Sequence, residues 1–335
     1  MKLRGERVVN LAPMQAALEP IEVSTDDLGP TEVVIRTRAT LISPGTELAN
    51  WQGKLHMNTD QPRWYPMTQV GYANVGEVVA AGSDVGVRPG QRVYSMGTHA
   101  SVVRIDARER FCVPVPDDLT DERAVFVRLA NVSMTTMRTT IARGGDAVAV
   151  IGLGLIGNLA AQVFQTCGMD VQAVDLSPAR REIAERCGLR AVHGPEALPD
   201  LARRHRLVVE ATGSAEALAG AIGLAQNGGE IVMIGAPWGG DENAVPSSRI
   251  TRELFFRFLT LRSGSEWELP RQPVPQLADS ILANVRTGLG WLRDGRLRVD
   301  PLITHRLPPA EIQHAYERLL DSKDEYLGII LTWSE

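Results

Sequence analysis

Hydrophobic and polar residues alternate over several short stretches in residues 1–116. VVIRTRA carries this pattern, GEVVAAG and QRVYSM are strand-like and followed by turn signals, and ASVVRID and RFCVPVP complete the set, with turn residues such as SPG and GVRPGQ between them. A period of two indicates strands with one buried face. The frequent turns favour a small barrel or sandwich.

From about residue 118 the pattern changes to that of helices alternating with strands. DDLTDERAVFVRLANVSMTTMRTT has helical spacing, and AVAVIG and DVQAVD are apolar, strand-like runs. In SPARREIAERCG we expect Ser177 as the N-cap, Pro178 as the first helical residue and Gly188 just past the end. Apolar strands separated by helices indicate a parallel sheet covered on both faces, hence an α/β fold.

Composition narrows the class of protein. The chain has 335 residues, 44% of them hydrophobic, a net charge of −5 and three cysteines. This length allows two domains, and the negative charge argues against a nucleic-acid surface. No apolar run is long enough for a membrane span, and MKLRGERVVN lacks the apolar segment of a signal peptide. We therefore expect a cytoplasmic protein that acts on a small molecule.

The segment VIGLGLIG contains Gly152, Gly154 and Gly157 in G-x-G-x-x-G spacing between a strand and a helix. Gly152 permits the tight turn, Gly154 lets the backbone approach a pyrophosphate, and Gly157 lets helix and strand pack closely. The amides that open the helix would bind the phosphates. They belong to Leu155 and Ile156.

Asp175 ends the next predicted strand and indicates which dinucleotide binds. Its carboxylate can accept hydrogen bonds from the ribose hydroxyls of NAD, whereas it would repel the 2′-phosphate of NADP. Arg180 and Arg181 could partly compensate that repulsion, but we interpret them as solvent-facing helix residues. NAD is therefore expected, with NADP the less favoured cofactor.

Two later strand ends also belong to the predicted cofactor site, because ligands bind at the carboxyl ends of parallel strands. EATGS and GAPWGG follow these strands. Their expected cofactor contacts are Thr212, Gly213, Gly235, Ala236 and Pro237. Trp238 is a candidate wall for the nicotinamide or the substrate, or else a packing residue.

The β-rich first part, GLGLIG with Asp175 and the C-terminal return resemble the medium-chain dehydrogenase/reductase superfamily over essentially the whole chain. The resemblance implies a GroES-like catalytic domain over 1–117, a Rossmann NAD-binding domain over 118–265, and a return over 266–335 that completes the catalytic domain. It also implies an active site in the cleft between domains and a homodimer joined through sheet edges, for which EIVMIG and LTLRSG are suitable strands.

The same resemblance implies that zinc is absent. Zinc-containing members carry ligands at three positions, where this chain has Ser43, Tyr72 and the pair Ala130–Asn131. Zinc favours thiolate, imidazole or carboxylate ligands. I-S-P-G-T-E, Gly71-Tyr72, Glu266-Trp267 and L-I-T-H are most similar to the bacteriochlorophyllide a dehydrogenase subgroup, which oxidises a hydroxyethyl group without zinc.

Protein groups must then replace the metal, as hydrogen-bond donors to the developing alkoxide or as a general base. Tyr72 is a candidate donor, or a proton relay if its pKa is depressed. Glu47 is a candidate base or an anchor for the 43–47 turn. Ser43 is a candidate donor to the substrate. Lys54 and His56, on the following loop, are further catalytic candidates, or else exposed loop residues.

Glu266, just after the last Rossmann strand, is a further catalytic candidate. Trp51 and Trp64 flank a polar loop and could stack on a sugar or ring, or cap the barrel mouth. We therefore expect a zinc-independent, NAD-dependent dehydrogenase of a secondary alcohol that is sugar-like, cyclitol-like or otherwise ring-bearing. Alternatives are an NADPH-dependent enoyl or quinone reductase, a bacteriochlorophyllide-type hydroxyethyl dehydrogenase, and a non-catalytic dinucleotide-binding protein.

Overall fold

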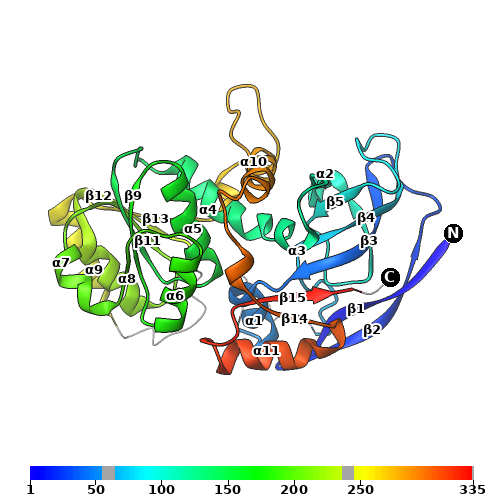
Figure 1. Ribbon diagram of the computed structural model, residues 1–335, viewed down its shortest axis with the longest axis horizontal. Coiled ribbons are helices and arrows are strands. Elements are labelled where there is room, and N and C mark those ends of the chain that lie inside the picture. Colours follow the sequence, from blue (N-terminus) through cyan, green and yellow to red (C-terminus); the bar gives the residue numbers. More distant parts are fainter. Residues whose placement is uncertain (55–64, 236–244, 334–335) are drawn as a thin grey trace. The chain divides into compact units, whose positions relative to one another are not determined.

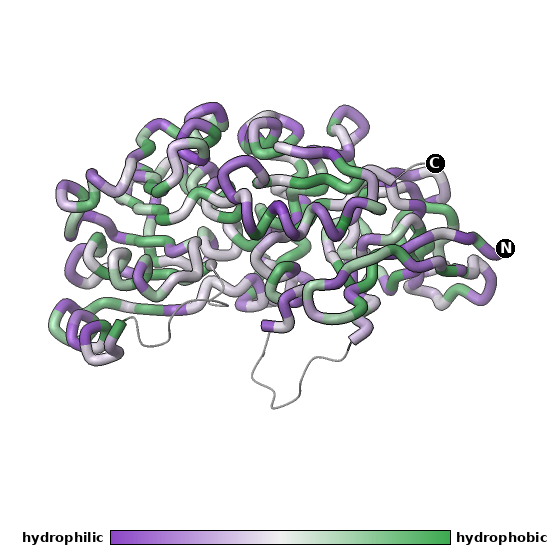
Figure 2. The backbone as a smooth tube through the Cα atoms, turned by 90° about the horizontal axis from the view of Figure 1, so that it is seen from below, coloured by the Kyte–Doolittle hydropathy of each residue, from purple (hydrophilic) through white to green (hydrophobic). Residues whose placement is uncertain are grey.

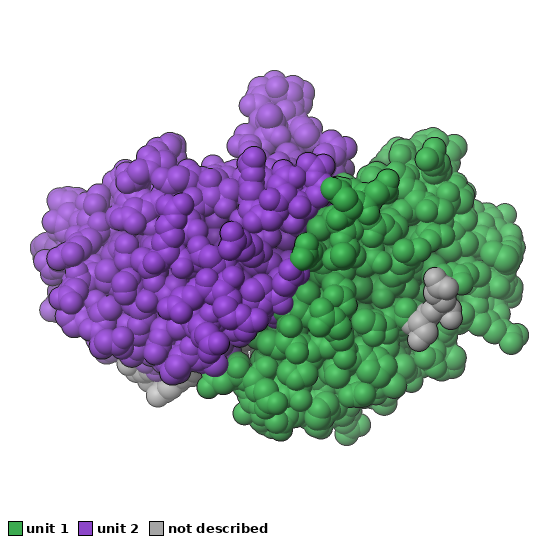
Figure 3. All heavy atoms as spheres, in the orientation of Figure 1, with its two compact units in different colours: residues 1–128, 303–335 green, residues 129–302 purple. Residues whose placement is uncertain are grey.

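The computed structural model describes residues 1–54, 65–235 and 245–333. They form two compact units, unit 1 (residues 1–128 and 303–335) and unit 2 (residues 129–302), which Figure 3 distinguishes by colour. The units divide after residues 128 and 302, whereas the expected domains divide after residues 117 and 265. Arg92 forms an ion pair with Asp121, and Arg306 forms one with Glu122, and these pairs attach residues 121–122 to unit 1.

Unit 1 is β-rich, as the alternating pattern predicts. Among its described residues, a seven-stranded sheet has the order β14-β15-β3-β4-β5-β7, with β6 pairing with β3 off this path, and β1 and β2 form a separate hairpin (Figure 1). The strands are β1 (Lys2–Ala12), β2 (Gln15–Ser24), β3 (Glu32–Leu41), β4 (Asn74–Ala81), β5 (Arg92–Ser95), β6 (Val102–Asp106), β7 (Val113–Pro114), β14 (Ile303–Leu307) and β15 (Gly328–Thr332).

The sheet of unit 1 divides at β3. One edge of β3 pairs with β4, while the other edge pairs with β6 over residues 32–36 and with β15 over residues 39–41. The helical segments of this unit are α1 (Pro44–Trp51), α2 (Ala107–Arg110), α3 (Asp121–Ala124), η4 (Pro309–Glu311) and α11 (Ile312–Asp321). Helices α1 and α11 contact each other, and buried side chains from both share one core with Val8, Ile42 and Ile329.

Unit 2 contains the predicted parallel sheet. Its described strands have the order β10-β9-β8-β11-β12-β13, which is the doubly wound order of a Rossmann fold. The strands are β8 (Ala147–Ile151), β9 (Asp170–Val174), β10 (Val192–His193), β11 (His205–Glu210), β12 (Ala225–Met233) and β13 (Thr260–Ser263). Strand β13 lies at an edge of the sheet, whereas β12, which contains the first four residues of EIVMIG, pairs on both sides.

Helices cover both faces of this sheet (Figure 1). Alternate strand residues serve two cores: Val148 and Val150 pack in the core that includes Phe164 of α5, and Ala149 packs in the core that includes Ile222 of α8. The helical segments are α4 (Val127–Thr139), which crosses the unit boundary, α5 (Leu155–Thr166), α6 (Pro178–Arg186), η1 (Pro195–Ala197), α7 (Leu198–Leu201), α8 (Ala215–Leu224), α9 (Ser247–Arg257), η2 (Glu266–Glu268), α10 (Ile281–Arg293) and η3 (Asp300–Leu302).

The local signals of α6 are confirmed. Ser177 caps the helix by accepting a hydrogen bond from the amide of Arg180, Pro178 opens it, and Gly188 has φ +88° just beyond its end.

Figure 2 shows hydrophobic colour mainly on interior strands and hydrophilic colour on outer turns. Within the described ranges, no helix is both long and apolar enough to cross a bilayer.

We predict that Gly157→Ala destabilises unit 2, because its Cβ would lie 1.8 Å from the carbonyl oxygen of Gly152. Overpacking of this kind costs about 3 kcal/mol, which corresponds to a fall of about 6–12 °C in the melting temperature of a unit of this size. Gly154→Ala is the matched control, since its Cβ would lie 4.0 Å from Nη1 of Arg180 and its φ is −61°. Equal melting temperatures for the two variants, measured by circular dichroism, would contradict this packing.

Candidate functional site

The segment that follows β3 forms the start of a helix rather than an open loop. Ser43 is the N-cap residue of α1 and Pro44 its first residue, but the Ser43 side chain makes no capping bond. Instead, the Ser43 amide donates to Oε1 of Glu47 at 2.7 Å. The Ser43 hydroxyl is thereby left to other partners.

Glu47 lies at the centre of a buried hydrogen-bond network. Its side chain is 2% exposed, and Oε2 lies 2.9 Å from both Nε2 of His99 and the hydroxyl of Tyr316. Burial, followed by the Glu47 carboxylate, raises the pKa of Tyr316, so this phenol stays protonated and donates. Both carboxylate oxygens of Glu47 are thus engaged within unit 1, as an anchor of the 43–47 turn would be.

Tyr72 and Ser43 form a pair of hydroxyls. The Tyr72 hydroxyl donates to Oγ of Ser43 at 2.7 Å. Burial raises the pKa of Tyr72, although the Arg128 guanidinium acts in the opposite direction. The condition for a proton relay, a depressed pKa, is therefore not met, and Tyr72 is a hydrogen-bond donor at neutral pH.

Sequence reasoning missed Arg128. Its side chain is 6% exposed, and its guanidinium carbon lies 4.6 Å from the centroid of the Tyr72 ring. The available signal was a single charge inside the apolar run AVFVRLA, since a buried arginine in such a run needs a specific partner. Its position beside Tyr72 depends on tertiary packing.

The substrate role expected for Trp51 does not fit its position. Trp51 is 0% exposed and packs at a tilt on Tyr316, with ring centroids 5.6 Å apart. It belongs to the core of unit 1, where it packs with side chains of α11. Lys54 is exposed just after α1. His56 and Trp64 lie outside the described residues.

Glu266 lies in unit 2 and is 7% exposed. Its carboxylate accepts a hydrogen bond from the side-chain amide of Asn131 in α4. The residue expected after the last Rossmann strand and a residue at the third zinc-ligand position therefore contact each other. Sequence reasoning named both positions but not their pairing.

The side chains at the zinc-ligand positions do not fit a zinc ion. Ser43 and Tyr72 present hydroxyls that bond to each other, and Asn131 presents an amide. In residues 1–54, 65–235 and 245–333, no group of three or more His, Cys, Asp or Glu side chains could hold a metal ion. These donors differ from the thiolate, imidazole and carboxylate ligands of zinc proteins.

The glycine turn in unit 2 has the geometry that a pyrophosphate site requires. Gly152 has φ +90°, and a Cβ there would lie 2.5 Å from Cγ2 of Thr212. Gly154 is the N-cap of α5, whose first two residues are Leu155 and Ile156. The amides that open α5 lack intrahelical acceptors, as they do in dinucleotide-binding proteins.

Two backbone amides orient Asp175. Its Oδ2 accepts from the amide of Leu153 at 2.6 Å, and its Oδ1 accepts from the amide of Ser177 at 2.8 Å.

Arg180 and Arg181 do not simply face solvent, which corrects our interpretation of them as solvent-facing helix residues. Nη1 of Arg180 approaches Gly154, and Nη1 of Arg181 donates to the carbonyl oxygens of Asp175 and Leu176 at 2.9 and 3.0 Å.

Glu210, which sequence reasoning also missed, organises the next strand end. It is 2% exposed and accepts hydrogen bonds from the amides of Thr212 and Gly213 at 2.6 and 3.2 Å. Gly235 packs so closely that its Cβ would lie 2.3 Å from the Gly213 amide nitrogen. Ala236, Pro237 and Trp238 lie outside the described residues.

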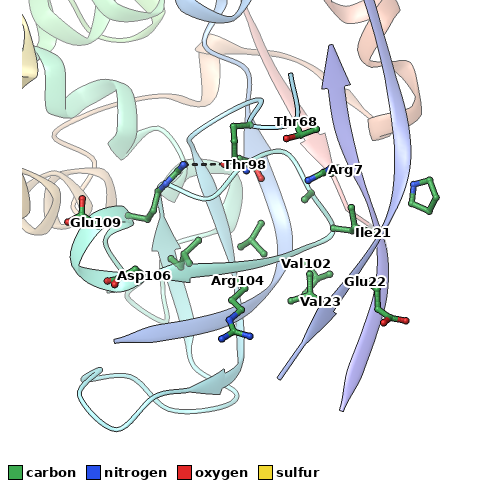
Figure 4. A pocket seen from close by; sticks show the side chains of 16 residues that line it. Arg7, Ile21, Glu22, Val23, Thr68, Thr98, Val102, Arg104, Asp106 and Glu109 are labelled. Atoms are coloured by element: carbon green, nitrogen blue, oxygen red, sulfur yellow. Dashed lines mark hydrogen bonds between the residues drawn. The ribbon is translucent and has the colours of Figure 1, made fainter. Parts of the chain in front are cut away.

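A separate cavity of about 620 Å³ lies in unit 1 beside β1, β2 and β6. Figure 4 shows Arg7 and Glu22 on one side and Arg104 and Asp106 on the other. Arg7 and Arg104 are already paired with Glu19 and Glu32. The residues that line this cavity do not include the Ser43–Tyr72 pair.

Comparisons with known proteins find dehydrogenases similar to this chain. The profile of the family described as zinc-binding dehydrogenase matches residues 156–271. The chain is 30% identical to 2-desacetyl-2-hydroxyethyl bacteriochlorophyllide A dehydrogenase of Rhodobacter capsulatus, over 92% of each protein. It is 24% identical to L-galactonate-5-dehydrogenase of Escherichia coli, over 90% of this chain and 92% of that protein.

The fold is also similar to that of solved dehydrogenases. The crystal structure of L-idonate 5-dehydrogenase from Escherichia coli superposes with a TM-score of 0.81 at 16% identity, over 99% of each chain. This similarity supports the expected α/β architecture, a GroES-like β-rich unit and a Rossmann unit. The 30% identity to the bacteriochlorophyllide dehydrogenase over 92% of the chain, together with the match to the zinc-binding dehydrogenase family, shows that the chain belongs to the medium-chain dehydrogenase/reductase superfamily.

Proposed function

We propose that this protein transfers a hydride between a secondary alcohol and NAD without zinc. The observation that carries the proposal is the 2.7 Å hydrogen bond between Tyr72 and Ser43, at two positions where zinc-containing relatives have ligands. The proposed substrate is sugar-like, cyclitol-like or otherwise ring-bearing. Two relatives support this substrate class, because their names refer to a hydroxyethyl bacteriochlorophyllide and to L-galactonate.

In this proposal the alcohol loses its hydroxyl proton to water as the hydride passes to NAD, and negative charge develops on the substrate oxygen. The Tyr72 phenol, whose single proton is donated to Ser43 in the free protein, donates that proton to the substrate oxygen instead and stabilises the charge. Its raised pKa supports a donor rather than a base. Ser43 orients the phenol, and Glu47 holds the turn that carries Ser43. The glycine turn and Asp175 would hold NAD, which would supply the hydride acceptor.

Asp175 supports NAD as the cofactor, because its carboxylate is fixed at the end of β9 and would repel a 2′-phosphate. One observation favours the alternative. Arg180 approaches Gly154, and its cation would attract the extra phosphate of NADPH. An NADPH-dependent enoyl or quinone reductase is therefore the second candidate.

Other features fit a protein that meets small molecules in the cytoplasm. Cys112, Cys167 and Cys187 are free thiols, as is usual in a reducing compartment. Nucleic acid is a poor partner for a chain with a net charge of −5. We propose a small-molecule substrate and a cytoplasmic location.

We predict that NADH binds at least about tenfold more tightly than NADPH, equivalent to about 1.4 kcal/mol, because of repulsion at Asp175. Fluorescence titration measures both affinities, and Asp175→Ser should remove the preference. Gly154→Ala, whose fold we expect to persist, should weaken NADH binding because its methyl group occupies the face of the phosphate turn. Tighter binding of NADPH would favour the reductase.

Activity panels test the reaction itself, with alcohols plus NAD and carbonyl compounds plus NADH, each with and without EDTA. The hydroxyethyl bacteriochlorophyllide is included as one substrate. We expect turnover that EDTA leaves unchanged. Loss of activity with EDTA would refute zinc independence, and no turnover in either panel would support the non-catalytic alternative.

We predict that Tyr72→Phe lowers kcat/KM by about 10²-fold, the usual effect of removing one donor to a developing oxyanion. The melting temperature should change little, because the ring is retained. Steady-state kinetics and circular dichroism measure the two effects. An unchanged kcat/KM would show that Tyr72 does not contact the reacting oxygen.

Glu47→Gln is the matched comparison. The glutamine side chain would direct its N–H group at one of the three donors that now bond to the carboxylate, so that donor would lose its acceptor. An unsatisfied buried donor costs about 1–3 kcal/mol. The melting temperature should therefore fall. A Glu47→Gln variant with wild-type stability and no activity would instead identify Glu47 as the catalytic base.

We also propose that the protein is a homodimer joined through β13. Phe255, Phe256 and Phe258, at the end of α9 beside this strand, are 76%, 70% and 79% exposed. Three exposed aromatic side chains are typical of an interface.

We expect Phe256→Ser to yield a monomer in size-exclusion chromatography with light scattering. Leu176→Ser is the control, since Leu176 is 77% exposed elsewhere in unit 2. A wild-type monomer, or a Phe256→Ser dimer of unchanged affinity, would contradict the proposal.

A further inference from the structure

Arg128 is a buried cation on the face of a tyrosine. The guanidinium carbon lies 4.6 Å from the centroid of the Tyr72 ring, and the residue is 6% exposed. A cation over an aromatic face is attracted by the ring quadrupole, more strongly where water is excluded. The contact therefore restricts the orientation of the ring.

The sequence around Arg128 holds it in this place. Phe126, Val127 and Leu129 are 0%, 0% and 2% exposed, so the backbone around Arg128 is packed into the protein. The Arg128 amide donates to the carbonyl oxygen of Val125 in the turn that leads into α4. A long side chain that starts from such a buried backbone cannot reorient freely toward solvent.

The groups that face the Tyr72 phenol come from two helices. Ser43 and Thr46 present hydroxyls from α1 and its cap, Glu47 presents a carboxylate from α1, and Arg128 presents its cation from α4. Burial raises the pKa of Tyr72 and the Glu47 carboxylate adds to that rise, whereas Arg128 is the charged group that lowers it. Arg128 thus favours negative charge on the phenol oxygen.

We infer that Arg128 is a positioning residue that fixes the Tyr72 ring and supplies, through it, positive charge to the substrate oxygen. This role rests on the proposed function of Tyr72. In zinc-binding relatives a metal cation polarises the oxygen directly. In this chain the Arg128 cation acts from the ring face of the Tyr72 donor.

The first test reads the Tyr72 phenol itself. A fluorinated tyrosine, whose phenol ionises at lower pH, is incorporated at position 72 and titrated by ¹⁹F NMR. Arg128→Met should move the titration midpoint to higher pH, while Arg128→Lys, which keeps the charge, should leave it near that of the wild type. Arg7→Met is the control, since Arg7 pairs with Glu19 instead.

The second test is kinetic. Arg128→Met should lower kcat by about tenfold, equivalent to about 1.4 kcal/mol, with KM changing less than about threefold. Arg128→Lys should restore most of this loss. In a Tyr72→Phe background Arg128→Met should have no further effect, because the arginine acts through the phenol.

A folded Arg128→Met variant with an unchanged ¹⁹F midpoint would overturn the inference, as would an equal loss of kcat in the Tyr72→Phe background. If Arg128→Met does not fold, Arg128→Gln replaces it under the same criteria. A midpoint shifted in the Lys variant as far as in the neutral variant would also overturn it. If the wild type shows no hydride transfer, the proposed function fails, but the titration still decides whether Arg128 controls the Tyr72 phenol.

Discussion

The buried carboxylate of Glu47 is the constraint on which the candidate site in unit 1 depends. A carboxylate without water needs hydrogen-bond donors, and Glu47 has three, from Ser43, His99 and Tyr316. These donors come from α1, from the segment before β6 and from α11. Satisfying one charge therefore fixes three parts of the chain, and it places the Ser43 hydroxyl where Tyr72 donates to it.

This arrangement clarifies how a dehydrogenase fold can present a polar site without metal ligands. Zinc lowers the pKa of bound water from its value in bulk water to about 7, which corresponds to about 12 kcal/mol of stabilised charge. One hydroxyl donor contributes only about 10²–10³ in rate, so no single side chain replaces the ion. The Ser43–Tyr72 pair and the Arg128 cation are the groups that the proposed mechanism combines.

Unit 2 follows a different logic, in which backbone rather than side chains determines the site. Gly152 adopts φ +90°, and a Cβ at position 157 would have no room beside the carbonyl oxygen of Gly152. Asp175 and Glu210 accept hydrogen bonds from backbone amides of the turns that follow the strands. Such a site is largely local in sequence, because each turn joins a strand to the helix that follows it.

The sequence by itself determined the alternation of strands and helices in unit 2, the caps of α6, the glycine turn and Asp175. These features depend on the period of apolar residues and on the φ angles of a few positions, which neighbouring residues control. Sequence reasoning also located Ser43, Tyr72 and Glu266 as residues of interest, because they occupy the positions of metal ligands or follow the last strand.

Only the tertiary structure decided what these side chains contact. Glu47 and Tyr316 are 269 positions apart, and no local pattern predicts their hydrogen bond. Trp51 resembles a loop aromatic in sequence, yet α1 turns it into the core. Arg128 is one charge in the apolar run AVFVRLA until the fold places Tyr72 against it. Burial and pairing depend on distant segments, so they are properties of the fold and not of the local sequence.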